Sequence, residues 1–232
     1  MQVNYDADVI TYRIGFTTQD VDSENIVRAR VDNFIDGIRE KLQFSFSTDS
    51  ELFLLSDSAN NFRFKIFPEY KANRPPKPRW TPFVKDYLLE QYNAVIVPYH
   101  EADDALAMYQ TDDSICVSID KDLLQIPGAH FGMVSHEFTT IEEFDGLFWF
   151  YQQLMMGDNT DNISGIQGLG AARTRTILKD CKTEAEMWQA VLATYAKYEM
   201  DESIPLRNGK LMWCHRKPVD INTLENIWIP PQ

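Results

Sequence analysis

The stretch ICVSIDKD, residues 115 to 122, predicts the fold of this chain. Its first five residues form a short apolar run typical of a buried strand, and two acids follow it at once. Three other apolar runs are also followed by acids. These runs and the acids after them are 3–5 with Asp6 and Asp8, 52–55 with Asp57, 94–97 with Glu101, Asp103 and Asp104, and 115–119 with Asp120 and Asp122.

Helical patterns lie between or beyond these runs. Apolar residues recur at three- and four-residue spacing from Glu24 to Leu42, which predicts an amphipathic helix. A second helix is expected from Glu184 to about Tyr198, with Thr183 and Glu186 as its capping box. Short strands that alternate with helices predict an α/β fold with a mostly parallel central sheet flanked by helices.

The acids after the strands predict a site at one edge of the sheet. Ligands of open α/β sheets bind beyond the carboxyl ends of the strands, so these side chains should converge there. One such pair alone is more often a helix cap or a solvated turn. Four clusters together would repel one another and raise each other's pKa unless cations neutralised them. Carboxylates suit Mg²⁺ or Mn²⁺, and two ions about 4 Å apart can drive phosphodiester hydrolysis.

Composition excludes several classes of protein. The 232 residues are 44% hydrophobic, which is ordinary for a globular chain. No apolar run reaches the roughly 18 residues of a membrane span, and the N-terminus does not resemble a signal peptide, so we expect a soluble cytosolic protein. The three cysteines and four histidines lack the spacing of a disulfide framework or a zinc site.

The charge distribution matters more than the net charge of −13, which alone argues against a nucleic-acid partner. Seven basic residues and one acid lie between Arg63 and Lys85. Tyr70 and Trp80 are interleaved with them and could stack on bases, although a solvated face is the usual role of a charge run. The prolines of PPKPRWTP, residues 75 to 82, predict an exposed loop or clamp.

A fifth acidic pair stands in GDNTDNISGIQGLG, residues 157 to 170. Asp158 and Asp161 are followed by three glycines, Gly165, Gly168 and Gly170. Glycines allow a backbone to approach phosphate closely, and amides at a helix start bind anions. With Arg173 and Arg175 beyond it, this segment could grip a duplex backbone, while a simple tight turn is the alternative.

In this order, these motifs resemble the flap endonuclease and five-prime exonuclease superfamily, most closely its bacteriophage-type members. The resemblance covers most of the chain. The matching motifs are DAD at 6–8 followed by Arg13, Asp57, PEYKANR at 68–74, EADD at 101–104, SIDKDLLQIPG at 118–128 and GDNTDNISGIQGLG at 157–170.

The resemblance implies roles for particular residues. The direct or water-mediated metal ligands would be Asp6, Asp57, Glu101, Asp103, Asp104, Asp120, Asp122, Asp158 and Asp161, with Asp8 as an outer contact. Lys71 and Arg74 would face the scissile phosphate, Arg13 would bind another phosphate, and Tyr70 would stack near the terminal base. The glycine turn resembles a helix-three-turn-helix element that binds duplex backbone and holds K⁺.

Two features depart from the family pattern. Ala172 stands where a lysine is usual, with Arg173 next, and the span from Asp57 to Glu101 is short for a helical arch. We expect a nuclease core at 1–156 with a basic arch or clamp at about 62–90. A helix-three-turn-helix and C-terminal helical region at 157–232 should pack on that core as one structural unit.

The resemblance implies a metal-dependent 5'-3' exonuclease, with short-flap cleavage and RNase H-like primer removal as further activities. Its expected partner is duplex DNA with a 5' end, nick, gap or short flap, or an RNA–DNA hybrid. We expect a monomer in the cytoplasm, that of the host cell if a phage encodes it. A PIN-type endoribonuclease and an inactive DNA-end-binding module remain the alternatives.

Overall fold

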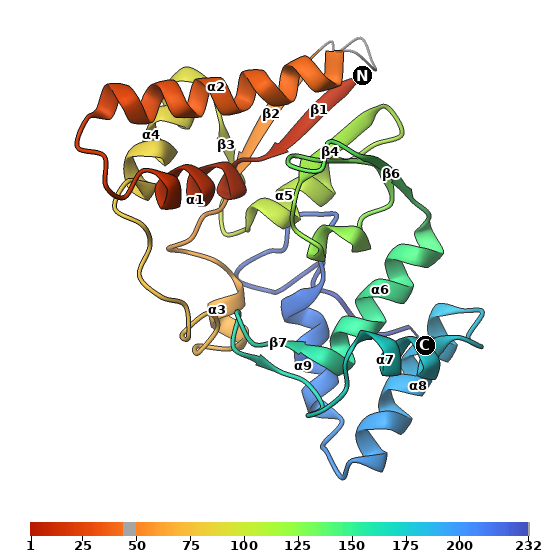
Figure 1. Ribbon diagram of the computed structural model, residues 1–232. Helices are drawn as coiled ribbons and strands as arrows, with labels where there is room; N and C mark the ends of the chain where they lie inside the picture. Colours follow the sequence, from red (N-terminus) through yellow and green to blue (C-terminus); the bar gives the residue numbers. More distant parts are fainter. Residues whose placement is uncertain (44–49, 232) are drawn as a thin grey trace.

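A six-stranded sheet forms the centre of the molecule (Figure 1). The structure is a computed structural model that describes residues 1–43 and 50–231. The strands are β1 (Gln2–Asp6), β2 (Ser50–Leu55), β3 (Val95–Ile96), β4 (Ser114–Ser118), β5 (Gly128–Gly132) and β6 (Phe138–Ile141). They lie in the order β3-β2-β1-β4-β5-β6, and all pairs are parallel except β5 with β6. The predicted α/β class with a mostly parallel sheet is therefore confirmed.

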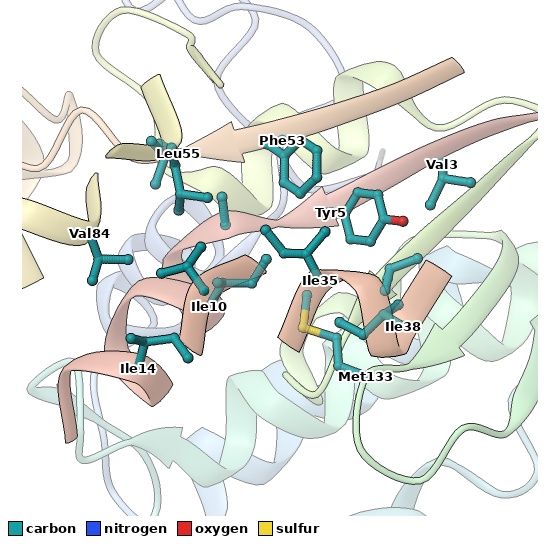
Figure 2. Packing of buried hydrophobic residues seen from close by; sticks show 14 of the residues in the cluster. Val3, Tyr5, Ile10, Ile14, Ile35, Ile38, Phe53, Leu55, Val84 and Met133 are labelled. Carbon is teal, nitrogen blue, oxygen red and sulfur yellow. The ribbon is translucent and has the colours of Figure 1, made fainter. Parts of the chain in front are cut away.

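Three helices cover one face of this sheet: α1 (Ala7–Thr17), α2 (Glu24–Gln43) and α4 (Thr81–Gln91). Figure 2 shows how Ile35 and Ile38 of α2 lie close to Tyr5 of β1. The predicted stripe of α2 is buried except for the half-buried Phe34, because its three- and four-residue spacing places those side chains on the face that meets the sheet.

The opposite face of the sheet carries α5 (Ala102–Tyr109) and the short 3₁₀ helix η1 (Asp122–Gln125). Their apolar side chains pack with Leu54, Cys116 and Cys214. Both of these cysteines are free and buried, as expected, whereas Cys181 is half-buried. This packing fixes the N-terminal end of α5 beside the ends of β1 and β2.

The C-terminal helices form a second apolar cluster. They are α6 (Glu143–Met156), α7 (Ala171–Leu178), α8 (Glu184–Lys197) and α9 (Ser203–Met212), with the hairpin β7 (Gly157–Asp158) and β8 (Ile163–Ser164) between α6 and α7. The capping box of Thr183 and Glu186 is confirmed. Because α6 also packs against η1, this cluster rests on the sheet domain.

The segment between β2 and β3 differs partly from its prediction. It contains the short helix α3 (Arg63–Ile66) and then residues 67–80, which form no helix. Pro82 lies in the first turn of α4, where a proline needs no amide partner, rather than in a loop. Pro78 and Trp80 are buried, so only part of the proline segment is exposed. In the part of the chain described, no helix has the length and apolar character needed to span a membrane.

Candidate active site

The predicted acids from several strand ends meet around one cavity. Its volume is about 430 Å³, and it lies beyond β1 and β4, where the strand order changes direction. Asp6 ends β1, Asp120 follows β4, and Asp103 comes from the first turn of α5. Asp8 and Glu101 complete the acidic lining. Parallel strands thus bring together carboxylates that lie more than one hundred residues apart in the chain.

A second cavity of about 350 Å³ adjoins the first and shares Asp120 and Arg74 with it. Its other acids are Asp122, at the start of η1, and Asp158. Asp161 lies on the turn after Asp158 and is buried. The fifth acidic pair of the sequence is therefore next to the strand-end acids.

The crowding of these carboxylates changes their protonation. Burial and the neighbouring Asp8 raise the pKa of Asp6 to about 7. Burial and Asp120 raise the pKa of Asp103 well above its usual range, and that of Asp122 to about 7. Burial and Asp161 also raise the pKa of Asp158. Mutual repulsion of this kind disfavours ionisation, and a bound cation would relieve it.

The chemistry of this donor set fits a hard divalent cation. All the acidic ligands offer oxygen, the donor that Mg²⁺ and Mn²⁺ prefer. Across residues 1–43 and 50–231, no three of these side chains are close enough to hold an ion as they stand. Lys71 and Arg74 line the same cavity; Lys71 pairs with Glu101 of its lining, and Arg74 pairs with Asp161 nearby. The carboxylates are therefore assembled around the cavity, and the protein's own cations neutralise some of them.

Asp104, which was expected to be a metal ligand, makes an internal ion pair in this structure. It is fully buried on the side of α5 that faces away from the cavity, where the Arg63 guanidinium donates to both of its oxygens at 2.5 and 2.9 Å. The backbone amide of His215 donates to it as well. Although burial opposes the charge, Arg63 holds the pKa of Asp104 well below its usual range. Consecutive helix residues point in different directions, so Asp103 lines the cavity and Asp104 serves the fold.

Asp57 was expected to be a direct or water-mediated ligand. It lies beyond β2, but it lines neither of the two cavities described above. Its carboxylate accepts hydrogen bonds from the Tyr99 amide and the Asn60 side chain, each at 3.0 Å. Each oxygen of Asp57 thus has a local donor, and of the two expected roles the water-mediated one fits a residue outside both cavities.

The basic segment does not form one continuous face. Arg63 is buried, Arg79 pairs with Asp22, and Lys65 donates to the backbone carbonyl of Ile221. Lys71 and Arg74 alone among the seven basic residues of this segment line the first cavity. The local positive charge is thus divided between the core, the surface and the site.

Lys71 and Arg74 make specific contacts with the acids. The Lys71 ammonium pairs with Glu101 and lies 3.6 Å from Asp161, and the Arg74 guanidinium pairs with Asp161. Burial opposes ionisation of Glu101, but Lys71 and Arg63 outweigh it and lower the pKa of Glu101. The backbone of Lys71 is left-handed, with φ of 60°, and its amide donates to the Asp161 carbonyl. Such a conformation is rare for a lysine and is retained where the surroundings enforce it.

The two aromatic residues proposed to stack on bases are buried. Tyr70 is 3% exposed and Trp80 is 8% exposed, so neither ring presents a face to a nucleotide in this structure. The Tyr70 ring packs edge-on against Phe64, and the Trp80 indole donates to the Val21 carbonyl. Burial and Glu101 raise the pKa of Tyr70 well above its usual range, so its hydroxyl stays protonated at neutral pH.

Two aromatic residues that were not predicted as site residues line the first cavity. Tyr12 and Phe16 of α1 line the first cavity, together with Ile119 after β4. Phe16 is 56% exposed and Ile119 is 51% exposed. Tyr12 and Phe16 are four residues apart on the helix that follows the DAD motif, and this spacing was the available signal. Arg13, beside them, also lines the cavity.

The glycine turn connects β8 to α7. A side chain at Gly165 would meet the Met156 backbone at 2.1 Å, and Gly168 has φ of 81°, so both positions require glycine. Gly170 is the N-cap of α7 and has open space beside it. Arg173 donates to the Gly168 carbonyl at 2.9 Å, while Arg175 is exposed.

Comparison with known proteins gives both sequence relatives and structural neighbours. No protein-family model matches the chain. The 5'-3' exonuclease of Buchnera aphidicola subsp. Schizaphis graminum is 25% identical over 88% of this chain and 76% of that protein. Flap endonuclease Xni of Shewanella pealeana is 25% identical over 75% of this chain and 73% of that protein.

Two solved structures from phage T5 share the fold. The 5'-exonuclease with bound zinc aligns with a TM-score of 0.68 at 18% identity, covering 91% of this chain and 89% of that one. The flap endonuclease in complex with DNA and metal ions aligns with a TM-score of 0.63 at 18% identity, covering 89% and 86%. These findings confirm that the chain resembles the flap endonuclease and 5'-3' exonuclease superfamily, to which its sequence motifs pointed.

Proposed function

We propose that this protein is a divalent-metal-dependent 5'-3' exonuclease that hydrolyses phosphodiester bonds in duplex DNA. The observation that carries the proposal is the cavity beyond β1 and β4, which is lined both by acids with raised pKa values and by Lys71 and Arg74. An acidic wall suits metal ions, and a basic wall suits the phosphate that those ions would share. The 5' polarity follows from the names of the sequence relatives.

The ligand roles are divided between the two cavities. In the first cavity, Asp6, Asp103, Asp120 and Glu101 would hold one ion. Asp122 and Asp158 of the second cavity would hold a second ion together with Asp161, which lies on the turn after Asp158. Asp57 would act through water. Bound Mg²⁺ or Mn²⁺ would activate a water for in-line attack and stabilise the leaving oxygen. Asp8 would contribute outside the ligand set, because its carboxylate already accepts a bond from the Ser56 amide at 3.3 Å.

The chain's own cations and aromatic residues would place the nucleotide. Lys71 and Arg74 would bind the scissile phosphate once ions have taken over Glu101 and Asp161, and Arg13 would bind a neighbouring phosphate. Tyr12 and Phe16 would stack on the base at the 5' end, since both line the cavity. Aromatic stacking tolerates any base, which fits an enzyme that does not read sequence.

The glycine turn would hold the duplex beyond the cleavage site. Amides at the start of α7 would bind backbone phosphate, Arg175 would add charge, and K⁺ would be coordinated by carbonyls of the turn. Arg173 would first support the turn through its bond to Gly168. Such contacts position a duplex without reading its sequence, so RNA–DNA hybrids and duplexes with short flaps would also be substrates. The protein would act as a monomer.

Digestion of end-labelled substrates tests this function. Duplex DNA labelled at the 5' or the 3' end, gapped duplex, short flaps and RNA–DNA hybrids are incubated with Mg²⁺ or with EDTA. We expect early release of the 5' label that depends on Mg²⁺ and is lost in Asp120→Asn, whereas Asp112→Asn, an exposed control, behaves as wild type. Cleavage of single-stranded RNA in preference to duplex DNA would favour a PIN-type endoribonuclease. Binding without any cleavage would favour an inactive DNA-end-binding module.

A further inference from the structure

The hydroxyl group of Tyr70 lies between two acids that belong to different parts of the site. It is 2.9 Å from Glu101 Oε2, before α5, and 2.9 Å from Asp161 Oδ2, on the turn between β7 and β8. Sixty residues of the chain separate these carboxylates, and the phenolic group is a direct bridge between them. A phenol has one hydroxyl proton, so the two carboxylates share it, and the hydroxyl links them through a three-centre hydrogen bond.

The tyrosine approaches the carboxylates from the protein interior. Its ring packs in a small apolar cluster with Ile163 and Leu211. Tyr70 is not among the residues that line the first cavity, whereas Lys71, Arg74 and Glu101 are, within the described chain. An ion or phosphate would therefore meet Lys71 and Arg74 first, and the tyrosine bond could persist behind the carboxylates.

The segment that carries Tyr70 is fastened to the turn that carries Asp161. Besides the bond from the Lys71 amide to the Asp161 carbonyl, the Asn73 side chain donates to that of Asn162 at 2.8 Å. The Asn162 side chain in turn donates to the Glu69 carbonyl at 2.9 Å. These bonds on both sides of Tyr70 hold its ring at a defined position relative to Asp161.

From this geometry we infer that Tyr70 is a positioning residue, whose hydroxyl orients Glu101, a ligand of the first proposed ion, and Asp161, a ligand of the second. Hydrogen-bond partners behind metal ligands orient those ligands, and their loss typically costs roughly 10- to 100-fold in metal affinity or activity. The role replaces base stacking, which the burial of the ring excludes in this structure. The inference rests on the metal-dependent cleavage proposed above.

Substitutions at Tyr70 distinguish positioning of the carboxylates from base stacking, because phenylalanine keeps the ring and removes the hydroxyl. Calcium binding to the DNA-free protein is measured by calorimetry for wild type, Tyr70→Phe and Tyr70→Leu. Positioning predicts that both variants bind calcium roughly 10- to 100-fold more weakly. Stacking predicts that Tyr70→Phe binds calcium as wild type does. Tyr87→Phe is the matched control, since Tyr87 also donates to a carboxylate, Asp32, away from the site.

Cleavage assays with Mg²⁺ on the same proteins give the second readout. We expect Tyr70→Phe to lower kcat at fixed Mg²⁺ and to recover part of the loss at high Mg²⁺, with KM for DNA changed little. Calcium affinity and kcat equal to wild type in Tyr70→Phe would overturn the inference. A Tyr70→Phe protein that is unfolded in calcium buffer at low temperature would also overturn it, because the hydroxyl would then serve the fold. Wild-type protein that neither binds calcium nor cleaves would instead contradict the proposed function.

Discussion

Asp103 and Asp104 are adjacent in the sequence and have opposite environments. Asp103 lines the cavity, makes no ion pair within the described residues, and has a pKa raised by burial and by Asp120. Asp104 is buried against Arg63, which lowers its pKa despite burial. Asp6 and Asp122 likewise have raised pKa values, whereas Lys71 and Arg63 lower the pKa of Glu101. The protein thus neutralises one group of its acids internally and leaves the other group to be neutralised from outside, which is the property expected of a metal site.

The largest effect is expected on turnover when an acid of the cavity group is neutralised. Asp103→Asn should remove a metal ligand and lower kcat by about a thousandfold or more, since metal ions contribute several kcal/mol and each 1.36 kcal/mol is a factor of ten. DNA binding should stay within several-fold, because the basic contacts remain. Single-turnover cleavage and fluorescence anisotropy would measure the two quantities. Wild-type turnover in the purified variant would place Asp103 outside the ligand set.

The next largest effect is expected on stability when the neighbouring residue is changed. Asp104→Asn should lower the free energy of unfolding by about 3–5 kcal/mol, because it leaves the buried Arg63 charge without its partner. Urea denaturation in EDTA would measure this change for both variants. Asp103→Asn should lose no stability in the same buffer, since it relieves repulsion from Asp120. Equal losses of unfolding free energy in the two variants would show that Asp103 and Asp104 do not differ in their contribution to stability.

A third prediction concerns the cations opposite the acids. Lys71→Ala should lower kcat by about 100- to 1000-fold, the typical loss when one group that stabilises developing charge is removed. Affinity for DNA should fall much less, because Lys71 would be one of several phosphate contacts. Lys77→Ala is the matched control, since Lys77 is exposed in the same segment and does not line the first cavity. It should change affinity and salt dependence without slowing the chemical step.

A smaller effect is expected from pH in the metal-free protein. The pKa values of Asp6 and Asp122 are about 7 in the folded protein, against an ordinary value of 3.8. The folded state therefore binds more protons than the unfolded state between these values, and these two groups make stability fall as pH rises from about 4 to about 7. Acids with lowered pKa values, such as Asp104, change the stability only at pH values below this range.

Urea midpoints in EDTA at several pH values and constant ionic strength would test this window. The decline should be shallower in Asp6→Asn with Asp122→Asn than in wild type. An equal decline in the double variant would show that other groups cause it.

The sequence predicted those features that depend on local pattern. Each of the four predicted strands is present because a short apolar run can be buried between helices, and the stripe of α2 faces the sheet as its spacing required. Strand ends then determined where Asp6, Asp103 and Asp120 meet, since parallel strands end at the same edge. The capping box before α8 was likewise a local signal.

Features that depend on distant partners could not be predicted in this way. Asp103 and Asp104 are chemically identical, and their difference depends on Arg63, some forty residues earlier. Tyr70 is buried because Leu211 of α9 packs on it, far along the chain. Strands β5 and β6 were not predicted, because GAHFG and FTTI lack a clear apolar run; β5 pairs with β4, and β6 pairs with β5.

The central claim is that the cavity acids bind divalent ions in the folded protein, and thermal unfolding with calcium tests it most directly. An ion that binds only the folded form at ten times its Kd adds about 1.4 kcal/mol, which raises Tm by about 3–6 °C for a domain of this size. The scan compares wild type with Asp103→Asn combined with Asp120→Asn, at constant ionic strength and without DNA. We predict a rise of this size in wild type and almost none in the double variant. Equal rises in both proteins would show that calcium acts on the general acidic surface and would contradict the account.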